Sequence, residues 1–340
     1  MLLLARALAA RGDLDQIVIT GRGTALESRL RESGVPVRAV GWRAGLSPAA
    51  LAAAIAESAR APAILHAHDA HALTLAGAAA RLTGTPYIVT RRVDFHLRRQ
   101  GFWTGARRII AISDAVRRIL IEDGIPARRI VRVHSGIDLE MVRRIRAGDI
   151  REQLGLPADA PLALAVGALV DHKDHATLVN AAAAARGERP DLHWAVAGEG
   201  PLRPVLEQQI LGLGLGDRVR LLGQVAEPLR LIAGADVFVM SSREEGLGTS
   251  VLDAMALDVP IAATEAGGIP EMLSGGAGLL SAPGDSAALA RSVTRILADP
   301  LLRKNLAQTA QDRVEQFSAS AMAEGVLGVY RSIVETVDLK

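Results

Sequence analysis

Residues 241–271, SSREEGLGTSVLDAMALDVPIAATEAGGIPE, decide the fold because they hold two strand-to-helix junctions. The apolar run 236–240 has the length of a strand and 249–257 has the pattern of a helix, so 244–248 is predicted to be the loop between them. A second strand, 259–264, leads to the turn GGIPE, which opens another helix with a proline near its first position. Loops at the carboxyl ends of parallel strands carry the ligand sites of such sheets, so this stretch also predicts a binding site.

The predicted loop has the composition of a phosphate-binding turn. Its glycines lack the Cβ atoms that would keep a ligand away, and the next helix presents free N–H groups and partial positive charge to a diphosphate. Glu245 lies in this loop, and Asp253 follows about two helical turns later, where it can accept hydrogen bonds from ribose hydroxyls. The spacing of the two acids indicates a nucleotide-sugar site. Its backbone contacts are expected from Gly246, Leu247, Gly248 and Thr249.

Strand and helix patterns alternate along the chain and predict parallel sheets covered on both faces. One alternation runs from 16–20 to 108–112, and a second from 162 to about 280. The polar segment 143–161 is the expected link between two domains. The composition, 340 residues with 49% hydrophobic residues and 33 glycines, agrees with an α/β protein of two domains. The absence of cysteine excludes disulfides, thiol nucleophiles and cysteine-ligated zinc.

The segment 241–271 resembles the carboxy-terminal signature of the group-one (family four) retaining glycosyltransferases. That family shows E-G-x-G, a second acid at this spacing, A-M-A, a proline-led strand and G-G-x-P-E. Similar segments, such as 134–138 and 167–173, occur in the expected order over nearly the whole chain. The resemblance implies the α/β GT-B fold, with two Rossmann-like domains facing each other across a cleft. It implies an acceptor domain over 1–150, a nucleotide-sugar domain over 151–320, and a terminal helix over 321–340 that crosses back.

The resemblance also implies roles for single residues. Lys173, one of three lysines in the chain, corresponds to the family lysine that neutralises the donor diphosphate and helps it depart. Glu245 would contact the donor sugar. Asp253 would hold the ribose, although the family usually has a glutamate there. Gly198 and Glu199 would approach the base or ribose from the opposite wall. No metal or cofactor is expected, and we favour a UDP-sugar over a GDP- or ADP-sugar as donor.

Two further positions depart from the family pattern. Ala168 stands where a second phosphate-neutralising arginine is usual, and loss of such a contact can cost about 2–4 kcal/mol of transition-state stabilisation. Arg91 and Arg92 stand where many members carry a histidine. Arginine cannot act as a general base, but it could stabilise the leaving phosphate or hold an anionic acceptor. In this family the departing phosphate is usually drawn as the group that takes the acceptor proton, so a protein base is not essential. Arg92 is therefore expected to be a catalytic residue together with Glu245 and Lys173.

The beginning of the chain predicts a gap in the first sheet. Residues 1–10 have a helical pattern, and 16–20 resembles the second strand of such a domain. The first strand and its glycine-rich turn are therefore expected to be missing, with a misplaced start or a damaged protein as explanations. In a sheet ordered 3-2-1-4-5 that strand would be central, and its omission would expose two edges.

Charge divides the chain unevenly. Residues 1–150 hold 23 arginines, no lysine and 13 acids, a net charge of +10, whereas the remainder carries −8. Between Arg91 and Arg118, eight arginines alternate with Phe95, Phe102 and Trp103, which suits an anionic membrane leaflet. The alternative is a solvated arginine-rich face. No nucleic-acid module accompanies the patch. Because no run approaches the roughly 20 apolar residues of a membrane span, we expect a cytoplasmic chain with peripheral contact to the inner membrane face.

Clustered histidines permit other interpretations. The segment 66–71, HAHDAH, resembles the H-x-H-x-D-H zinc pattern without matching it, and no later acid-and-histidine set completes a zinc site. His66 and His68 are instead expected to line the cleft on the acceptor side, with Arg91 and Arg92. The two histidines that flank Lys173, at 172 and 175, are expected to be solvated.

Together these features predict a metal-independent retaining hexosyltransferase. It would move a sugar from a nucleotide diphosphate to a lipid-linked, lipopolysaccharide or polysaccharide acceptor of the cell envelope. Two alternatives stay open. One is a degenerate homologue that binds a nucleotide without turnover, supported by Ala168, Asp253 and the missing strand. The other is a sugar-nucleotide epimerase or hydrolase on the same scaffold.

Overall fold

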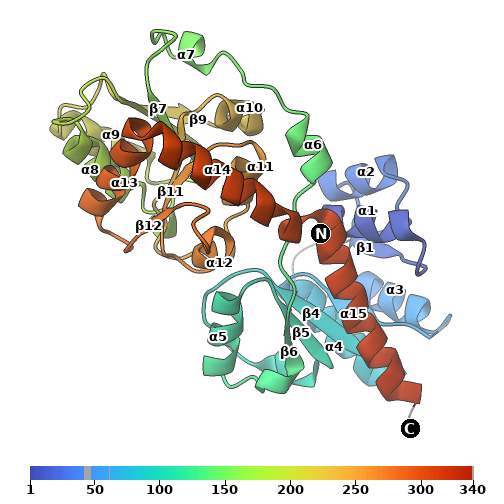
Figure 1. The fold of residues 1–340 in the computed structure, drawn as a ribbon. Coiled ribbons are helices and arrows are strands. Elements are labelled where there is room, and N and C mark those ends of the chain that lie inside the picture. The colour runs from blue at the N-terminus through green and yellow to red at the C-terminus, as the bar shows by residue number, and fades with distance from the viewer. Residues whose placement is uncertain (42–46, 61, 339–340) are drawn as a thin grey trace. The chain divides into compact units, whose positions relative to one another are not determined.

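The computed structural model describes residues 1–41, 47–60 and 62–338, which form two compact α/β units (Figure 1). The first unit comprises Met1–Gly136 and Ser318–Lys340, and the second comprises Ile137–Phe317. The strand pairs of both units are parallel. The predicted fold class, two parallel-sheet Rossmann-like domains, is therefore confirmed.

The second unit contains a six-stranded sheet ordered β12-β11-β10-β7-β8-β9. Its strands are almost continuously apolar because helices cover both faces. They are β7 (Leu162–Val166), β8 (His193–Ala197), β9 (Val219–Gly223), β10 (Val237–Met240), β11 (Ile261–Thr264) and β12 (Leu279–Ser281). The helices are α6 (Leu139–Arg143), α7 (Ile150–Gln153), α8 (His175–Ala185), α9 (Arg203–Gly212), α10 (Pro228–Ala233), α11 (Thr249–Ala256), α12 (Ile269–Leu273), α13 (Ser286–Ala298) and α14 (Pro300–Val314). The polar segment 143–161 lies inside this unit.

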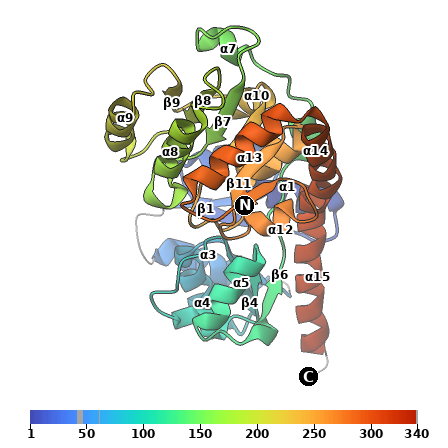
Figure 2. The same cartoon turned by 60° about the vertical axis from the view of Figure 1, so that its left-hand side comes forward.

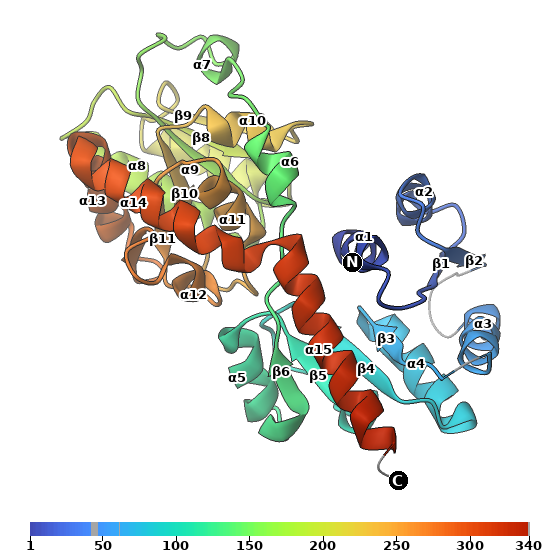
Figure 3. The same ribbon diagram turned by 45° about the vertical axis from the view of Figure 1, so that its right-hand side comes forward.

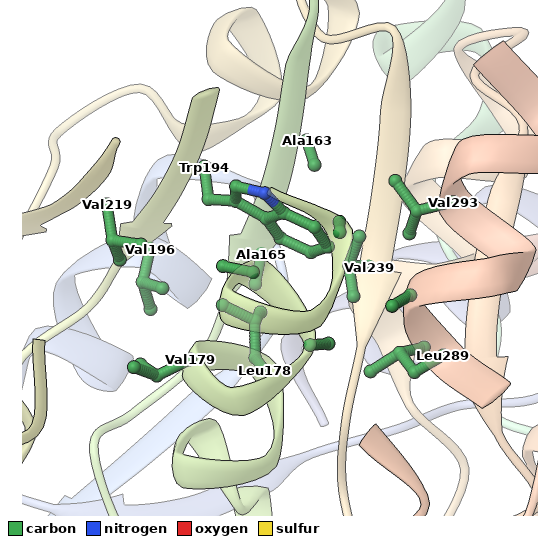
Figure 4. Packing of buried hydrophobic residues seen from close by; sticks show 14 of the residues in the cluster. Ala163, Ala165, Leu178, Val179, Trp194, Val196, Val219, Val239, Leu289 and Val293 are labelled. Carbon is green, nitrogen blue, oxygen red and sulfur yellow. The ribbon is translucent and has the colours of Figure 1, made fainter. Parts of the chain in front are cut away.

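The core of the second unit forms between the sheet and the paired helices α8 and α13, which lie side by side (Figure 2). Trp194 on β8 is 2% exposed, and the strand register places it beside Ala163 of β7. The small alanines of β7 leave room for the indole ring, and Leu178 of α8 and Leu289 of α13 belong to the same cluster (Figure 4). This packed core holds the ends of β7 and β10 in place.

The first unit contains a four-stranded sheet, β3-β4-β5-β6, and a separate pair, β1-β2. The strands are β1 (Val18–Gly21), β2 (Val37–Val40), β3 (Leu65–Ala67), β4 (Tyr87–Arg91), β5 (Arg108–Ala111) and β6 (Ile130–Arg132). The helices are α1 (Leu2–Arg11), α2 (Ala25–Glu32), α3 (Pro48–Ser58), α4 (Ala70–Thr83), α5 (Asp114–Glu122) and α15 (Ala319–Asp338). Leu8 of α1 and Val326 of α15 are buried in one cluster with Ile88 of β4, so α15 returns to this unit.

The separation of the two sheets confirms the expected gap. In the described residues, β1 pairs only with β2 and β3 pairs only with β4 (Figure 3). A hollow of about 2430 Å³ is lined by residues of β1, β3, α1 and α15. The two exposed edges predicted for a sheet without its central strand are therefore β1 and β3.

Candidate functional site

The site of the second unit forms where the strand order reverses. The central strand β7 lies between β8 and β10, with Ala163 paired to Val237, so the loops that follow β7 and β10 begin side by side. In open parallel sheets, ligands bind at this switch point. The loop after β7 carries Lys173 and the loop after β10 carries Glu245.

Lys173 and Glu245 form an ion pair at this point. The Lys173 ammonium contacts the Glu245 carboxylate, and their side chains are 17% and 14% exposed. The structure thus joins two predicted site residues that lie 72 positions apart in the sequence. A partly buried ion pair at a strand switch point offers a positive charge to a phosphate and an acceptor to a hydroxyl.

Small polar residues hold the loop that carries Glu245. Ser241 donates to the main-chain oxygen of Lys173 at 3.0 Å, and Thr264 at the end of β11 donates to that of Ser242 at 2.6 Å. These three side chains are at most 1% exposed. The sequence analysis did not predict a role for these three residues. The only signal that the sequence holds is that each hydroxyl residue ends, or comes soon after, an apolar strand.

Gly267 lets a third loop reach the same place. The main-chain N–H of its neighbour Gly268 donates to the oxygen of Glu245 at 3.0 Å. A Cβ atom on Gly267, whose φ is +51°, would lie 1.6 Å from that oxygen. Only glycine fits this left-handed, crowded position.

We expect Gly267→Ala to displace the backbone at Glu245, and with it the turn at 246–248 that precedes α11. Nucleotide binding should weaken at least about tenfold, because small displacements of ligand-binding groups have large effects. Isothermal calorimetry with UDP measures the change. The control is Gly284→Ala, since Gly284 also has positive φ (+81°) but has no neighbouring atom within 4 Å of its Cβ position. Equal binding by both variants would contradict this prediction.

The turn after β8 touches the turn after β7 through its backbone. A Cβ atom on Gly198 would lie 1.9 Å from the main-chain oxygen of Gly167, and the N–H of Leu169 donates to the oxygen of Glu199 at 3.0 Å. The Glu199 carboxylate instead pairs with Arg203 at 2.7 Å. Gly198 and Glu199 therefore form a backbone wall beside the turn at 167–169.

The turn at 246–248 leads into an uncapped helix. Gly248 is the N-cap of α11, with φ +90°, and no side chain caps the helix. The N–H of Val251 already donates to the Gly248 oxygen at 3.0 Å, so within the described residues the N–H groups of Thr249 and Ser250 are the ones available to an anion. Leu247 is 2% exposed, so its side chain packs inward. The main chain of Leu247 and of Gly246, which is also buried, forms the turn.

Asp253 on α11 is a half-buried acid for which the described residues offer no partner. Burial raises the pKa of Asp253 to about 7. Within the described part of the chain, no hydrogen bond or ion pair reaches this carboxyl group. A desolvated carboxylate of this kind is stabilised by ligand hydroxyls that donate to it.

We expect Asp253→Asn to have opposite effects on stability and binding. Because burial raises the pKa of Asp253 from 3.8 to about 7, ionisation lowers the stability of the unliganded protein as pH rises through that interval. The variant lacks this loss, so its Tm at pH 8 should rise by roughly 2–4 °C. Its affinity for UDP at pH 8 should fall about tenfold.

The pH dependence separates this effect from titration of the nucleotide itself. If the ionised Asp253 accepts ribose hydroxyls, lowering the pH from 8 to 6 should weaken UDP binding by about tenfold more in the unsubstituted protein than in Asp253→Asn. Calorimetry of both proteins at both values measures the difference. Parallel pH profiles would show that Asp253 does not hold the ligand.

His175 corrects the expectation that both neighbouring histidines are solvated. Its side chain is 4% exposed, and burial lowers its pKa to about 4. The left-handed residue Asp174 turns the chain so that His175 Nε2 lies 3.2 Å from the main-chain oxygen of Ala168. A neutral His175 therefore supports the turn after β7.

In the first unit, His66, His68 and Arg92 lie together. The two imidazole rings are 4.1 Å apart between centroids, and burial lowers both pKa values, that of His66 to about 3. His66 contacts Tyr330 and Thr90, each at 2.7 Å. Arg92 donates to Ser135 at 3.3 Å and, like both histidines, lines the large hollow. Tyr330, on α15, was missed because it lies far away in the sequence.

Arg91 is separate from this cluster. Its guanidinium donates to the main-chain oxygens of Val93 and Phe95 and lies over the Trp103 ring at 5.5 Å. Trp103 is 7% exposed, whereas Phe95 is 43% exposed. Arg91 thus shapes its own loop, and part of the aromatic content of 91–118 is internal.

The described residues contain neither a candidate metal cluster nor a candidate membrane span. No group of three or more histidine, aspartate or glutamate side chains is placed to hold a metal ion. No helix there is both long and apolar enough to cross a membrane. The zinc alternative at 66–71 therefore receives no support from the described residues.

Solved structures share this architecture. The chain superposes on Anabaena Alr3699/HepE, solved in complex with UDP-glucose, with a TM-score of 0.82 and 22% identity, over 97% of this chain and 95% of that chain. The two Rossmann-like units, with a site at the strand switch point, define the GT-B class of fold.

Two models of protein families match the chain. Residues 1–141 match Glycosyltransferase Family 4, and residues 147–313 match Glycosyl transferases group 1. The chain belongs to this family of glycosyltransferases.

Curated relatives match part of the chain. The lipopolysaccharide core biosynthesis glycosyltransferase LpsE of Rhizobium meliloti is 35% identical over 185 residues, 54% of this chain and 53% of the relative. The D-inositol 3-phosphate glycosyltransferase of Frankia alni is 35% identical over 244 residues, 67% of this chain and 59% of the relative. The chain spans about half the length of the curated relatives that it matches first.

Proposed function

We propose that this chain is a retaining, metal-independent glycosyltransferase that moves a hexose from a UDP-sugar to an anionic lipid-linked or saccharide acceptor. The observation that carries the proposal is the Lys173–Glu245 pair at the strand switch point of the second unit. The half-buried Asp253 on α11, which has no partner among the described residues, supports it. The UDP complexes of its fold relative are consistent with the choice of nucleotide.

In the proposed donor site, Lys173 and the free N–H groups of α11 neutralise the diphosphate. Asp253 accepts the ribose hydroxyls, and Glu245 accepts a hydroxyl of the sugar. The diphosphate enters where Lys173 now pairs with Glu245, so donor binding exchanges one anionic partner of the ammonium for another. The backbone at Gly198 and Glu199 forms the wall next to the base or ribose.

In the proposed reaction, the bond between the anomeric carbon and the β-phosphate oxygen breaks, and the acceptor oxygen bonds to the same face of that carbon. The acceptor proton passes to the departing phosphate, so no protein base is required. The developing negative charge on the diphosphate is the charge that Lys173 stabilises.

The acceptor is assigned to the first unit. His66 and His68 are held neutral by burial, and Arg92 supplies a fixed positive charge beside them. This combination suits a hydroxylated acceptor with a phosphate or carboxylate group. The relatives include one named for a phosphorylated acceptor and one named for lipopolysaccharide core biosynthesis. A cytoplasmic site of action at the inner membrane face, in synthesis of envelope polysaccharide, follows from such an acceptor.

Product analysis tests the proposal. The purified chain is incubated with UDP-glucose, UDP-galactose or UDP-N-acetylglucosamine and a membrane lipid extract, and NMR follows the anomeric configuration. Transfer with retention is the expected result. A changed sugar nucleotide would favour an epimerase, and free sugar at the full rate without acceptor would favour a hydrolase. Nucleotide binding without any product would favour the degenerate homologue.

A further inference from the structure

Asp174 and Arg243 join the two loops that carry Lys173 and Glu245. Arg243 Nε donates to Asp174 Oδ2 at 2.7 Å, and the same carboxylate oxygen accepts from Thr177 Oγ1 at 2.6 Å. The Asp174 side chain is 4% exposed, whereas that of Arg243 is 62% exposed. Each residue is next to, or two positions from, a member of the Lys173–Glu245 pair.

Two further hydrogen bonds, both to main-chain oxygens, join the same two loops. The N–H of Arg243 donates to the oxygen of His172 at 2.8 Å, and Ser241 donates to the oxygen of Lys173 at 3.0 Å. The loops after β7 and β10 are therefore joined on both sides of Lys173. A lysine ammonium sits on a flexible four-carbon stem, so a fixed backbone limits the region that the ammonium can reach.

The backbone of Asp174 has an unfavourable conformation that the contacts of its carboxylate hold in place. Asp174 has φ +45° and ψ +47°, a left-handed conformation that non-glycine residues rarely adopt. Such a conformation persists where surrounding contacts determine it, and here the carboxylate accepts from both Thr177 and Arg243. A helix cap alone needs only Thr177, so the bond to Arg243 is additional.

We infer that Asp174 and Arg243 are positioning residues that fix Lys173 relative to Glu245 for binding of the donor diphosphate. The inference rests on the proposed function and adds two residues to the same site. Neither residue needs to touch the donor. Their effect on binding passes through the backbone of the loop at 171–174.

The test uses the full chain with Asp174→Asn, Arg243→Ala and the double variant, titrated with UDP. We expect each single variant to weaken UDP binding about tenfold, because displaced charges bind poorly. The double variant should be no weaker than the weaker single variant, since both changes break one contact. The control is Arg295→Ala, an exposed arginine on α13, which should bind UDP normally.

The sign of the Asp174→Asn effect separates positioning from other roles. If Arg243 itself held the diphosphate, freeing it from Asp174 would tighten UDP binding, which would overturn the inference. A lower Tm with unchanged UDP affinity would show a merely structural role and would also overturn it. If the unsubstituted chain binds no nucleotide, the proposed function fails and the inference with it. Normal binding by that chain and by both variants would overturn the inference alone.

Discussion

Replacement of Lys173 by alanine is expected to weaken UDP binding by about a hundredfold and to lower sugar transfer by about a thousandfold. Lys173 is the only lysine that the structure places at the strand switch point of the second unit, within the described residues. Its ammonium is a compact charge that pairs with Glu245, and Ala168 stands where the family usually has a second cation. Most of the diphosphate neutralisation therefore depends on Lys173. Transfer should fall further than binding because charge on the leaving phosphate increases in the transition state.

Calorimetry and initial rates with a UDP-sugar measure the two effects. The matched control is Lys304→Ala, because Lys304 is exposed on α14 of the same unit and should leave both quantities unchanged. Lys173→Arg should restore part of the binding but less of the rate, since a guanidinium cannot reproduce the position of the ammonium. Undiminished transfer by Lys173→Ala would contradict the proposed donor site.

Glu245→Gln should separate nucleotide binding from sugar transfer. In the free protein the Glu245 carboxylate forms an ion pair with the Lys173 ammonium, so a diphosphate must displace that carboxylate to reach the ammonium. Glutamine cannot form that ion pair, and we expect UDP itself to bind about fivefold more tightly. Transfer should fall at least about a hundredfold, because the neutral amide gives the donor sugar a weaker acceptor.

The neighbouring Glu244 supplies the control for Glu245→Gln. Glu244 is exposed in the same loop, and Glu244→Gln removes an equal charge from the same region. It should change UDP binding less than twofold at 0.15 M salt, where exposed charges are screened. Weaker UDP binding by Glu245→Gln would mean that Glu245 supports Lys173 instead of competing for it.

Much of the second unit could be predicted because its elements follow local rules. The strands 162–166 and 193–197 are buried on both faces, so their apolar runs gave their bounds. The family resemblance assigned Lys173 and Glu245 to one site. Parallel-sheet geometry, in which loops at the carboxyl ends of adjacent strands meet, explains their proximity. The predicted helix 249–257 likewise corresponds to α11.

The remaining features depend on contacts between distant segments, which local patterns do not encode. Tyr330 lies 264 positions from its partner His66. The sequence around His175 is typical of a solvated helix start, but the left-handed backbone of Asp174 turns the His175 side chain inward. Arg91 ends β4 and Arg92 directly follows it, yet the Arg91 side chain bonds to its own loop. Each outcome depends on tertiary packing that no sequence window contains.

We propose above all that the second unit holds the diphosphate of a nucleotide sugar through Lys173. The most direct measurement is calorimetric titration of the unsubstituted chain with UDP, GDP and ADP, repeated with Lys173→Ala. We predict micromolar binding of UDP, weaker binding of the other two nucleotides, and loss of about a hundredfold in affinity for the variant. A folded protein that binds none of the three nucleotides, or that binds UDP equally well without Lys173, would contradict it.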